Sequence, residues 1–244
     1  GPISRALQEE YIAESQQKLK GLVASLQGQA TIDTKVLMGT PFLEIVHEIL
    51  RHGHDLLIKA PENPEWLDRL FGSDDMHLLR KCPCAVWLVK NSSSKSYRRI
   101  LAAVDVATDY PDDELETRQN LNVKILELAI SLSLADFAEL HVAHAWEAAG
   151  ESALRGSFLQ RPEAEVLAYV EEVRKRYKTG LNGLLDDVIK KQGSDAIQYL
   201  DPQRHSVKGL ARKEIPALAT GLGADLVVMG SVARTGVAGL FIGN

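Results

Sequence analysis

The last fifteen residues carry the most specific chemical signal in this sequence, a glycine-rich turn. It follows the apolar run 225–229 and reads Gly230-Ser-Val-Ala-Arg-Thr-Gly-Val-Ala-Gly-Leu-Phe-Ile-Gly-Asn244. Such a turn after a parallel strand can direct backbone N–H groups at a phosphate, and a following helix N-terminus adds partial positive charge. Arg234 is the only cation in the turn. The pattern predicts an anion site, but it also fits a simple strand end whose glycines let a helix pack closely.

Several familiar catalytic arrangements are missing from the sequence. The turn lacks Gly-Lys-Ser/Thr, so it is not a P-loop and offers no evident metal-bound hydroxyl. His141 and His144 lie three residues apart on an expected strand, face opposite sides of it and cannot chelate one ion together. No Ser-His-Asp or Cys-His set can be placed by spacing alone. We therefore expect a binding protein rather than an enzyme.

Two further clusters allow a metal ion as one of two interpretations. The sequence predicts an acidic loop after the strand at 99–105, which we interpret as solvated rather than as a divalent-cation site; its members are Asp105, Asp109, Asp112, Asp113 and Glu114. Cys82 and Cys84 flank Pro83, but no second Cys or His cluster accompanies them, and tetrahedral zinc needs about four ligands. We interpret this pair as two small buried thiols in a reducing compartment.

Expected strands and helices alternate along the chain. Apolar runs predict strands at 34–38, 55–60, 84–90, 99–105, 138–145, within 197–207 and at 225–229. Apolar spacings of three and four predict helices at 7–26, from 41 to Gly53, through Leu79, at 121–134, 163–191 and 215–222. This alternation implies parallel pairing through right-handed crossovers. The predicted fold class is therefore α/β, with doubly wound, open parallel sheets of Rossmann-like type.

The chain also contains an internal repeat. Residues 38–60 align without a gap on residues 208–230, and the preceding helices correspond through 19–22 and 181–184. A repeat of this length indicates two copies of one unit. With the polar run 91–96 as a linker, the expected units are 1–94, which lacks an opening strand–helix–strand, and 95–244, which lacks a last helix and strand.

The first copy has lost the glycine-rich turn. Ala60 stands where the second copy has Gly230, and Pro61 and Pro64 follow it. Proline has no N–H to donate, and the nearby Glu62 and Glu65 would repel a phosphate. We therefore expect the first unit not to bind an anion.

These motifs resemble the universal stress protein family. Its nucleotide signature places a glycine, two residues, a second glycine, nine residues and then Gly-Ser/Thr around the phosphates and ribose of ATP. Gly230 and Gly243 match the first and third glycines, Ala233 replaces the second, and Asn244 replaces the hydroxyl residue. Residues 100–105 look like the family's first strand, whose terminal aspartate lies beside the adenine. Segments 77–90 and 230–244 resemble those of tandem-domain members.

The resemblance implies ATP or another adenine nucleotide in the second unit and no metal. The implied cofactor-binding residues are Asp105, Val142, Met229, Gly230, Ala233, Arg234, Gly243 and Asn244. The resemblance also implies a non-catalytic stress-response module that acts through partners or self-association. Two alternatives stay open: a slow nucleotide hydrolase, and a binder of an apolar ligand between the units, which Trp66, Leu70, Phe71 and Trp87 would line.

Composition narrows the partners further. The formal net charge of −5 gives no clustered basic surface for nucleic acid. No apolar run approaches the roughly 18 residues of a membrane span. No secretory signal opens the sequence, although Gly1-Pro2 looks like a cleavage scar. We expect a cytoplasmic protein.

Overall fold

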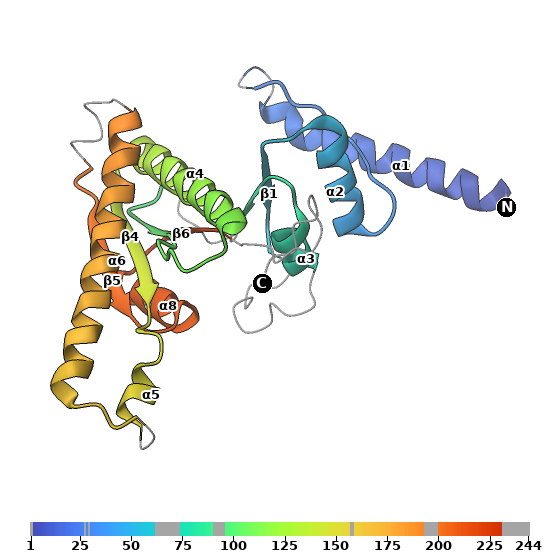
Figure 1. Cartoon of the computed structure of the whole chain (residues 1–244). Coiled ribbons are helices and arrows are strands. Elements are labelled where there is room, and N and C mark those ends of the chain that lie inside the picture. The colour runs from blue at the N-terminus through green and yellow to red at the C-terminus, as the bar shows by residue number, and fades with distance from the viewer. Residues whose placement is uncertain are drawn as a thin grey trace. The chain divides into compact units, whose positions relative to one another are not determined.

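The computed structural model describes residues 2–26, 28, 30–61, 74–89, 96–156, 159–192 and 200–230. The described residues fall into two compact units, a first within 2–89 and a second within 96–230, and each unit has its own parallel sheet (Figure 1). The units are described separately below.

The second unit is a four-stranded parallel sheet covered by helices. Its strands are β3 (Arg99–Ala103), β4 (Glu139–Trp146), β5 (Gln203–Lys208) and β6 (Leu226–Met229), in the order β5-β4-β3-β6. Its helices are α4 (Asp112–Asp136), α5 (Glu151–Arg155), α6 (Glu163–Gln192) and α8 (Ala211–Leu222). All strand pairs are parallel, which confirms the predicted fold class.

Alternate residues of β3 and β4 enter different cores. Ile100 and Val142 pack with α4 and α6 on one face, whereas Leu101 and Ala143 pack with Ile215 of α8 on the other. Successive side chains of a strand point to opposite faces, so this alternation is what a sheet covered on both sides requires. Figure 1 shows α4 and α6 against this sheet, with α8 on the opposite face.

The N-terminal end of α4 differs from the prediction. The helix begins at Asp112 rather than near 121, and its first turn contains Asp112, Asp113 and Glu114. Carboxylates are favourable there because the helix macrodipole places partial positive charge at the N-terminus. Three of the five residues of the predicted acidic loop therefore lie at a helix start.

The first unit has a smaller sheet, with two described strands instead of four. Its elements are α1 (Pro2–Val23), a 3₁₀ turn (Ala24–Leu26), α2 (Pro41–His52), β1 (Leu56–Lys59), α3 (Asp74–Lys81) and β2 (Ala85–Leu88). β1 pairs in parallel with β2. The strand predicted at 34–38 is wrong. It corresponds in the repeat to β5, which forms its ladder with β4, and the described part of the first unit contains no counterpart of β4.

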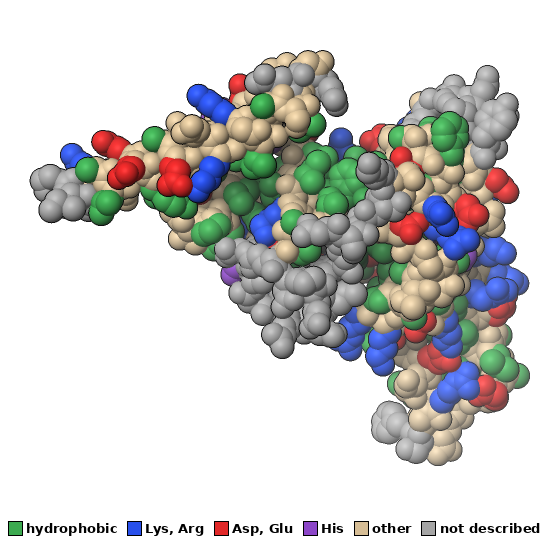
Figure 2. Space-filling model, turned by 180° about the vertical axis from the view of Figure 1, so that it is seen from behind, with side chains coloured by type: hydrophobic (Ala, Val, Ile, Leu, Met, Phe, Trp, Pro, Cys, Tyr) green, Lys and Arg blue, Asp and Glu red, His purple; other side chains and the backbone are tan. Residues whose placement is uncertain are grey.

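The same difference leaves apolar side chains of α1 and of the following 3₁₀ turn exposed. Tyr11 is 59% exposed and Leu26 is 45% exposed, whereas their counterparts Val173 and Val188 in α6 are 4% and 2% exposed. In the second unit this face of α6 packs on β4 and α4. Figure 2 shows apolar side chains interspersed with charged ones along α1.

The repeated glycines have matching backbone conformations. Gly39 and Gly209 have φ of +144° and +139°, and Gly53 and Gly223 end α2 and α8 in the left-handed region with φ of +66° and +63°. At Gly39 an added Cβ would lie 2.9 Å from Cγ of Glu44, and at Gly209 it would lie 2.6 Å from Oε1 of Glu214. Both copies therefore have glycine at the same position for the same two reasons: the backbone φ is positive, and a glutamate side chain lies close to where a Cβ would be.

Gly39→Ala and Gly209→Ala are each expected to lower the free energy of unfolding by about 1–3 kcal/mol, because alanine cannot adopt these φ values without strain. Gly21→Ala and Gly183→Ala are the matched controls, since these glycines lie inside α1 and α6 with no atom within 4 Å of an added Cβ. The controls should stabilise by about 0.5–1 kcal/mol. Urea unfolding checks the set, and an unchanged Gly209→Ala variant would contradict the argument.

Candidate functional site

The strand order reverses at β3, and this reversal defines the candidate site. The chain passes from β3 to β4 and β5 on one side, and then returns to place β6 on the other side of β3. In open α/β sheets, ligands bind outside the carboxyl ends of the strands at such a reversal. Ala103 pairs with Met229 at that edge. Asp105 and Gly230, which follow these residues, are therefore brought to the same edge of the sheet.

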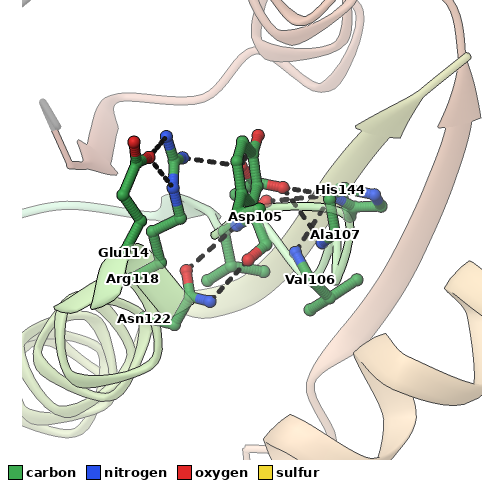
Figure 3. A network of polar contacts seen from close by, with 9 residues as sticks. Asp105, Val106, Ala107, Glu114, Arg118, Asn122 and His144 are labelled. Atoms are coloured by element: carbon green, nitrogen blue, oxygen red, sulfur yellow. Dashed lines mark hydrogen bonds and ion pairs between the residues drawn. The ribbon is translucent and has the colours of Figure 1, made fainter. Parts of the chain in front are cut away.

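The backbone of Asp105 is held by α4. Its N–H donates to Oδ1 of Asn122 at 3.0 Å, and its carbonyl oxygen accepts from Nδ2 of Asn122 at 2.6 Å. Asn122 is 5% exposed, so both bonds are shielded from water (Figure 3). This pair of bonds fixes the direction in which the Asp105 carboxylate leaves the sheet.

The Asp105 carboxylate already accepts hydrogen bonds within the chain. Oδ2 accepts from the Tyr110 hydroxyl at 2.8 Å and from Nη1 of Arg118 at 3.2 Å, and Oδ1 accepts from the Ala107 N–H at 3.1 Å. The guanidinium of Arg118 also donates to Glu114 and lies 3.5 Å from the centre of the Tyr110 ring. A ligand that uses this carboxylate must share it with Tyr110 and Arg118.

Tyr110 keeps its proton at neutral pH. Burial, followed by the hydrogen bond to Asp105 and the charge of that carboxylate, raises the pKa of the Tyr110 phenol to about 12. The hydroxyl is therefore a permanent donor to Asp105 under physiological conditions.

His144 lies directly beneath this network and is 3% exposed. Its Nδ1 is 3.2 Å from the Val104 carbonyl oxygen and 3.9 Å from Oδ1 of Asp105, and its ring lies 4.9 Å from that of Tyr177. Burial lowers the pKa of His144, with opposing effects from the Val104 carbonyl and the Asp105 charge. His144 is thus a neutral member of the core beneath the site. His141 instead contacts His205, which confirms that the two strand histidines face opposite sides.

The depressed pKa of His144 predicts a pH dependence of stability. The unfolded chain takes up a proton below the ordinary histidine pKa of about 6.5, whereas folded His144 resists protonation until lower pH. Stability should therefore fall as pH decreases through and below this value. Burial and the charge of His141 also lower the pKa of His205, which adds to the effect.

Urea unfolding at a series of pH values checks this prediction. His144→Gln should reduce the pH slope of the unfolding free energy, and His205→Gln should reduce it independently. A His144→Gln variant that keeps the full parental slope would contradict the assignment.

Gly230 meets α4 at the other side of the site. A Cβ added to it would lie 2.4 Å from Cδ2 and 2.7 Å from Cγ of Leu121. Packing against Leu121 therefore favours a glycine here, which agrees with the simpler of the two interpretations of this turn. Met229, one residue earlier, is 64% exposed at the strand end.

The other predicted site residues fall in different places. Val142 is fully buried in β4, where it pairs with Ala102 and Arg204, one residue before the level at which β3 ends. The remaining predicted residues lie outside the described residues; these are Ala233, Arg234, Gly243 and Asn244. Three aromatic or apolar residues of the alternative ligand site also lie outside them; these are Trp66, Leu70 and Phe71.

Sequence reasoning missed Tyr110 and the α4 residues Arg118 and Asn122. A signal was present: Glu114, Arg118 and Asn122 recur every four residues, which places them on one side of a helix. The helix was predicted to begin only near 121, so this polar row was not recognised.

Two negative findings apply to the described ranges only. They contain no group of three or more His, Cys, Asp or Glu side chains that could hold a metal ion. They also contain no helix with both the length and the apolar character needed to cross a bilayer.

Known proteins resemble this chain in sequence. It is 30% identical to universal stress protein E of Escherichia coli K12 over 222 residues, which cover 90% of this chain and 65% of that protein. A universal stress protein E homolog of Haemophilus influenzae is 30% identical over 202 residues, covering 82% and 60%. The chain thus spans about two thirds or less of the length of these relatives.

Solved structures resemble it in fold. A protein of unknown function from Pseudomonas aeruginosa PAO1 matches with a TM-score of 0.66 and 27% identity over 94% of this chain and 71% of that one. A universal stress protein from Archaeoglobus fulgidus matches in fold with a TM-score of 0.53 at 18% identity, over 94% and 73% of the two chains. The universal stress protein family model matches residues 96–244, more than half of the sequence. The chain belongs to the universal stress protein family.

Proposed function

We propose that the second unit is an adenine-nucleotide-binding module through which a stress-response protein signals. The observation that supports it most directly is the juxtaposition of Asp105 and Gly230 at the reversal in strand order. An adenine amino group would donate to the Asp105 carboxylate. Backbone amides after Gly230, together with Arg234, Gly243 and Asn244, would face the phosphates. Ala233, in place of a signature glycine, would weaken this contact.

The occupied state of Asp105 argues for modest affinity. Tyr110 and Arg118 already donate to the carboxylate, so the adenine would compete with two donors of the chain itself. We therefore expect reversible binding, in which the adenine replaces contacts that Asp105 makes with Tyr110 and Arg118.

We also propose that the protein is a cytoplasmic tandem of two such units, of which only the second binds nucleotide. The matching glycine conformations at 39 and 209 and at 53 and 223 support common descent of the units. Ala60 and Pro61 follow β1 where Gly230 follows β6, which supports an inactive first unit. Self-association is part of this proposal, with sedimentation as its test.

Calorimetric titration with ATP tests the nucleotide proposal. Asp105→Asn should weaken binding about tenfold, because the acceptor for the adenine amino group loses its charge. Tyr110→Phe should tighten it, because one competing donor is removed. Asp136→Asn is the matched control: Asp136 accepts from the Tyr97 N–H just before β3, at the opposite edge of the sheet.

Two results would count against the proposal. One is an Asp105→Asn variant that binds ATP as well as the parent and the Asp136→Asn control do. The other is release of ADP during the titration, which would favour the alternative of a slow hydrolase.

A further inference from the structure

Two thiols in the first unit lie in contact. Sγ of Cys82 is 3.5 Å from Sγ of Cys84, and both residues are half-buried, whereas the sequence suggested buried thiols. The N–H of Cys82 donates to the Leu78 carbonyl oxygen at the end of α3, and Cys84 directly precedes β2. Residues two apart have Cα atoms within about 7 Å, which is compatible with a disulfide after small adjustment.

A metal ion explains this pair poorly. Tetrahedral sites for thiolate-binding metals use about four protein ligands, and the described residues contain no group of three candidate ligands that includes these cysteines. The pair instead has what a dithiol needs: the two sulfurs are in contact, and both residues are partly exposed to solvent.

We propose that Cys82 and Cys84 form a redox-active dithiol, which small-molecule disulfides oxidise to an intramolecular disulfide. The Cys82 thiolate attacks one sulfur of the small disulfide, forms a mixed disulfide and releases one thiolate. Cys84 then loses its proton and attacks the Cys82 sulfur, which expels the second thiolate. Both cysteine sulfurs are oxidised, the small disulfide is reduced to two thiols, and the two protein protons go to the departing thiolates.

The surroundings assign the order of attack. Burial, then the hydrogen bond and charge of Cys82, raises the pKa of the Cys84 thiol to about 11, well above the ordinary cysteine value of about 8.5. This favours Cys82 as the thiol that attacks an external disulfide and Cys84 as the one that resolves the intermediate. The bond would join the end of α3 to the start of β2 through a short ring containing Pro83, and strained disulfides of this kind are readily reduced.

Mass spectrometry after alkylation tests the proposal on the full chain, equilibrated with mixtures of reduced and oxidised glutathione. Because the chain has only 2 cysteines, any intrachain disulfide must be this one. The parent should lose the mass of two hydrogens as the oxidised fraction rises, carry no stable glutathione, and recover both thiols when reduced glutathione is added. Cys84→Ser should accumulate a stable adduct on Cys82, and Cys82→Ser should form its adduct at least tenfold more slowly.

Three results would overturn the proposal. The parent could accumulate glutathione adducts without an intrachain disulfide. Both thiols could stay reduced in oxidised glutathione alone. Equimolar zinc could bind both thiols and block their oxidation, which would make the pair a metal site instead.

Discussion

Substituting Gly230 by alanine is expected to lower the free energy of unfolding of the second unit by about 1–3 kcal/mol, the usual cost of forcing an extra group into a packed contact. The added Cβ would lie 2.4 Å from Cδ2 of Leu121, so the Leu121 side chain, α4 or the end of β6 would have to move. Gly230→Val should cost more and should also abolish ATP binding. Urea unfolding and calorimetry measure the two effects.

The double variant separates packing from ligand binding at Gly230. In a Leu121→Ala background the penalty of Gly230→Ala should shrink by about 1 kcal/mol or more, because the two side chains are in direct contact. If Gly230→Ala costs the same in both backgrounds, the contact with Leu121 does not explain the glycine. If ATP binding is lost even where stability is restored, the glycine also serves the ligand.

Arg118→Ala is expected to be the most damaging charge deletion in the second unit, at about 1.5–3 kcal/mol, the range for hydrogen bonds to charged groups. The Arg118 side chain is only 12% exposed and donates to both Asp105 and Glu114. Its removal leaves two carboxylates near each other without their shared cation, and uncovers the Tyr110 ring.

Arg174→Ala is the control for Arg118. Arg174 also makes a two-point contact with a glutamate, Glu171, but both side chains are largely exposed, at 52% and 43%. Exposed ion pairs contribute little because water screens them, so no measurable loss is expected. Equal unfolding curves for the two variants would contradict the structural role assigned to Arg118.

The sequence predicted those helices and strands that are defined by the spacing of nearby apolar residues. The 30-residue helix α6 has an apolar side with regular spacing, β3 and β6 are short and mainly apolar, and β4 has apolar residues on alternate positions, so all were located within a few residues. The strand expected at 34–38 failed for a non-local reason. An extended segment becomes a strand only where a neighbour completes its hydrogen bonds, and no neighbour is described there.

Of the site residues, the sequence predicted only those that follow the end of a strand. Asp105 and Gly230 could be placed because a strand end is visible in the sequence. The contact of Arg118 with Asp105 could not, since it depends on how α4 crosses the sheet. The packing of Gly230 could not be predicted either, because it depends on where Leu121 lies in three dimensions.

Backbone amide chemical shifts of the nitrogen-labelled chain, recorded during titration with ATP, test the central claim most directly. The account predicts that the largest shifts belong to the amides of Asp105, Ala107 and Gly230, with the Tyr97 amide at the opposite edge of the sheet unchanged. Shifts centred instead on Ala60, at the carboxyl end of β1, would contradict it, as would a spectrum that saturating ATP leaves unaltered.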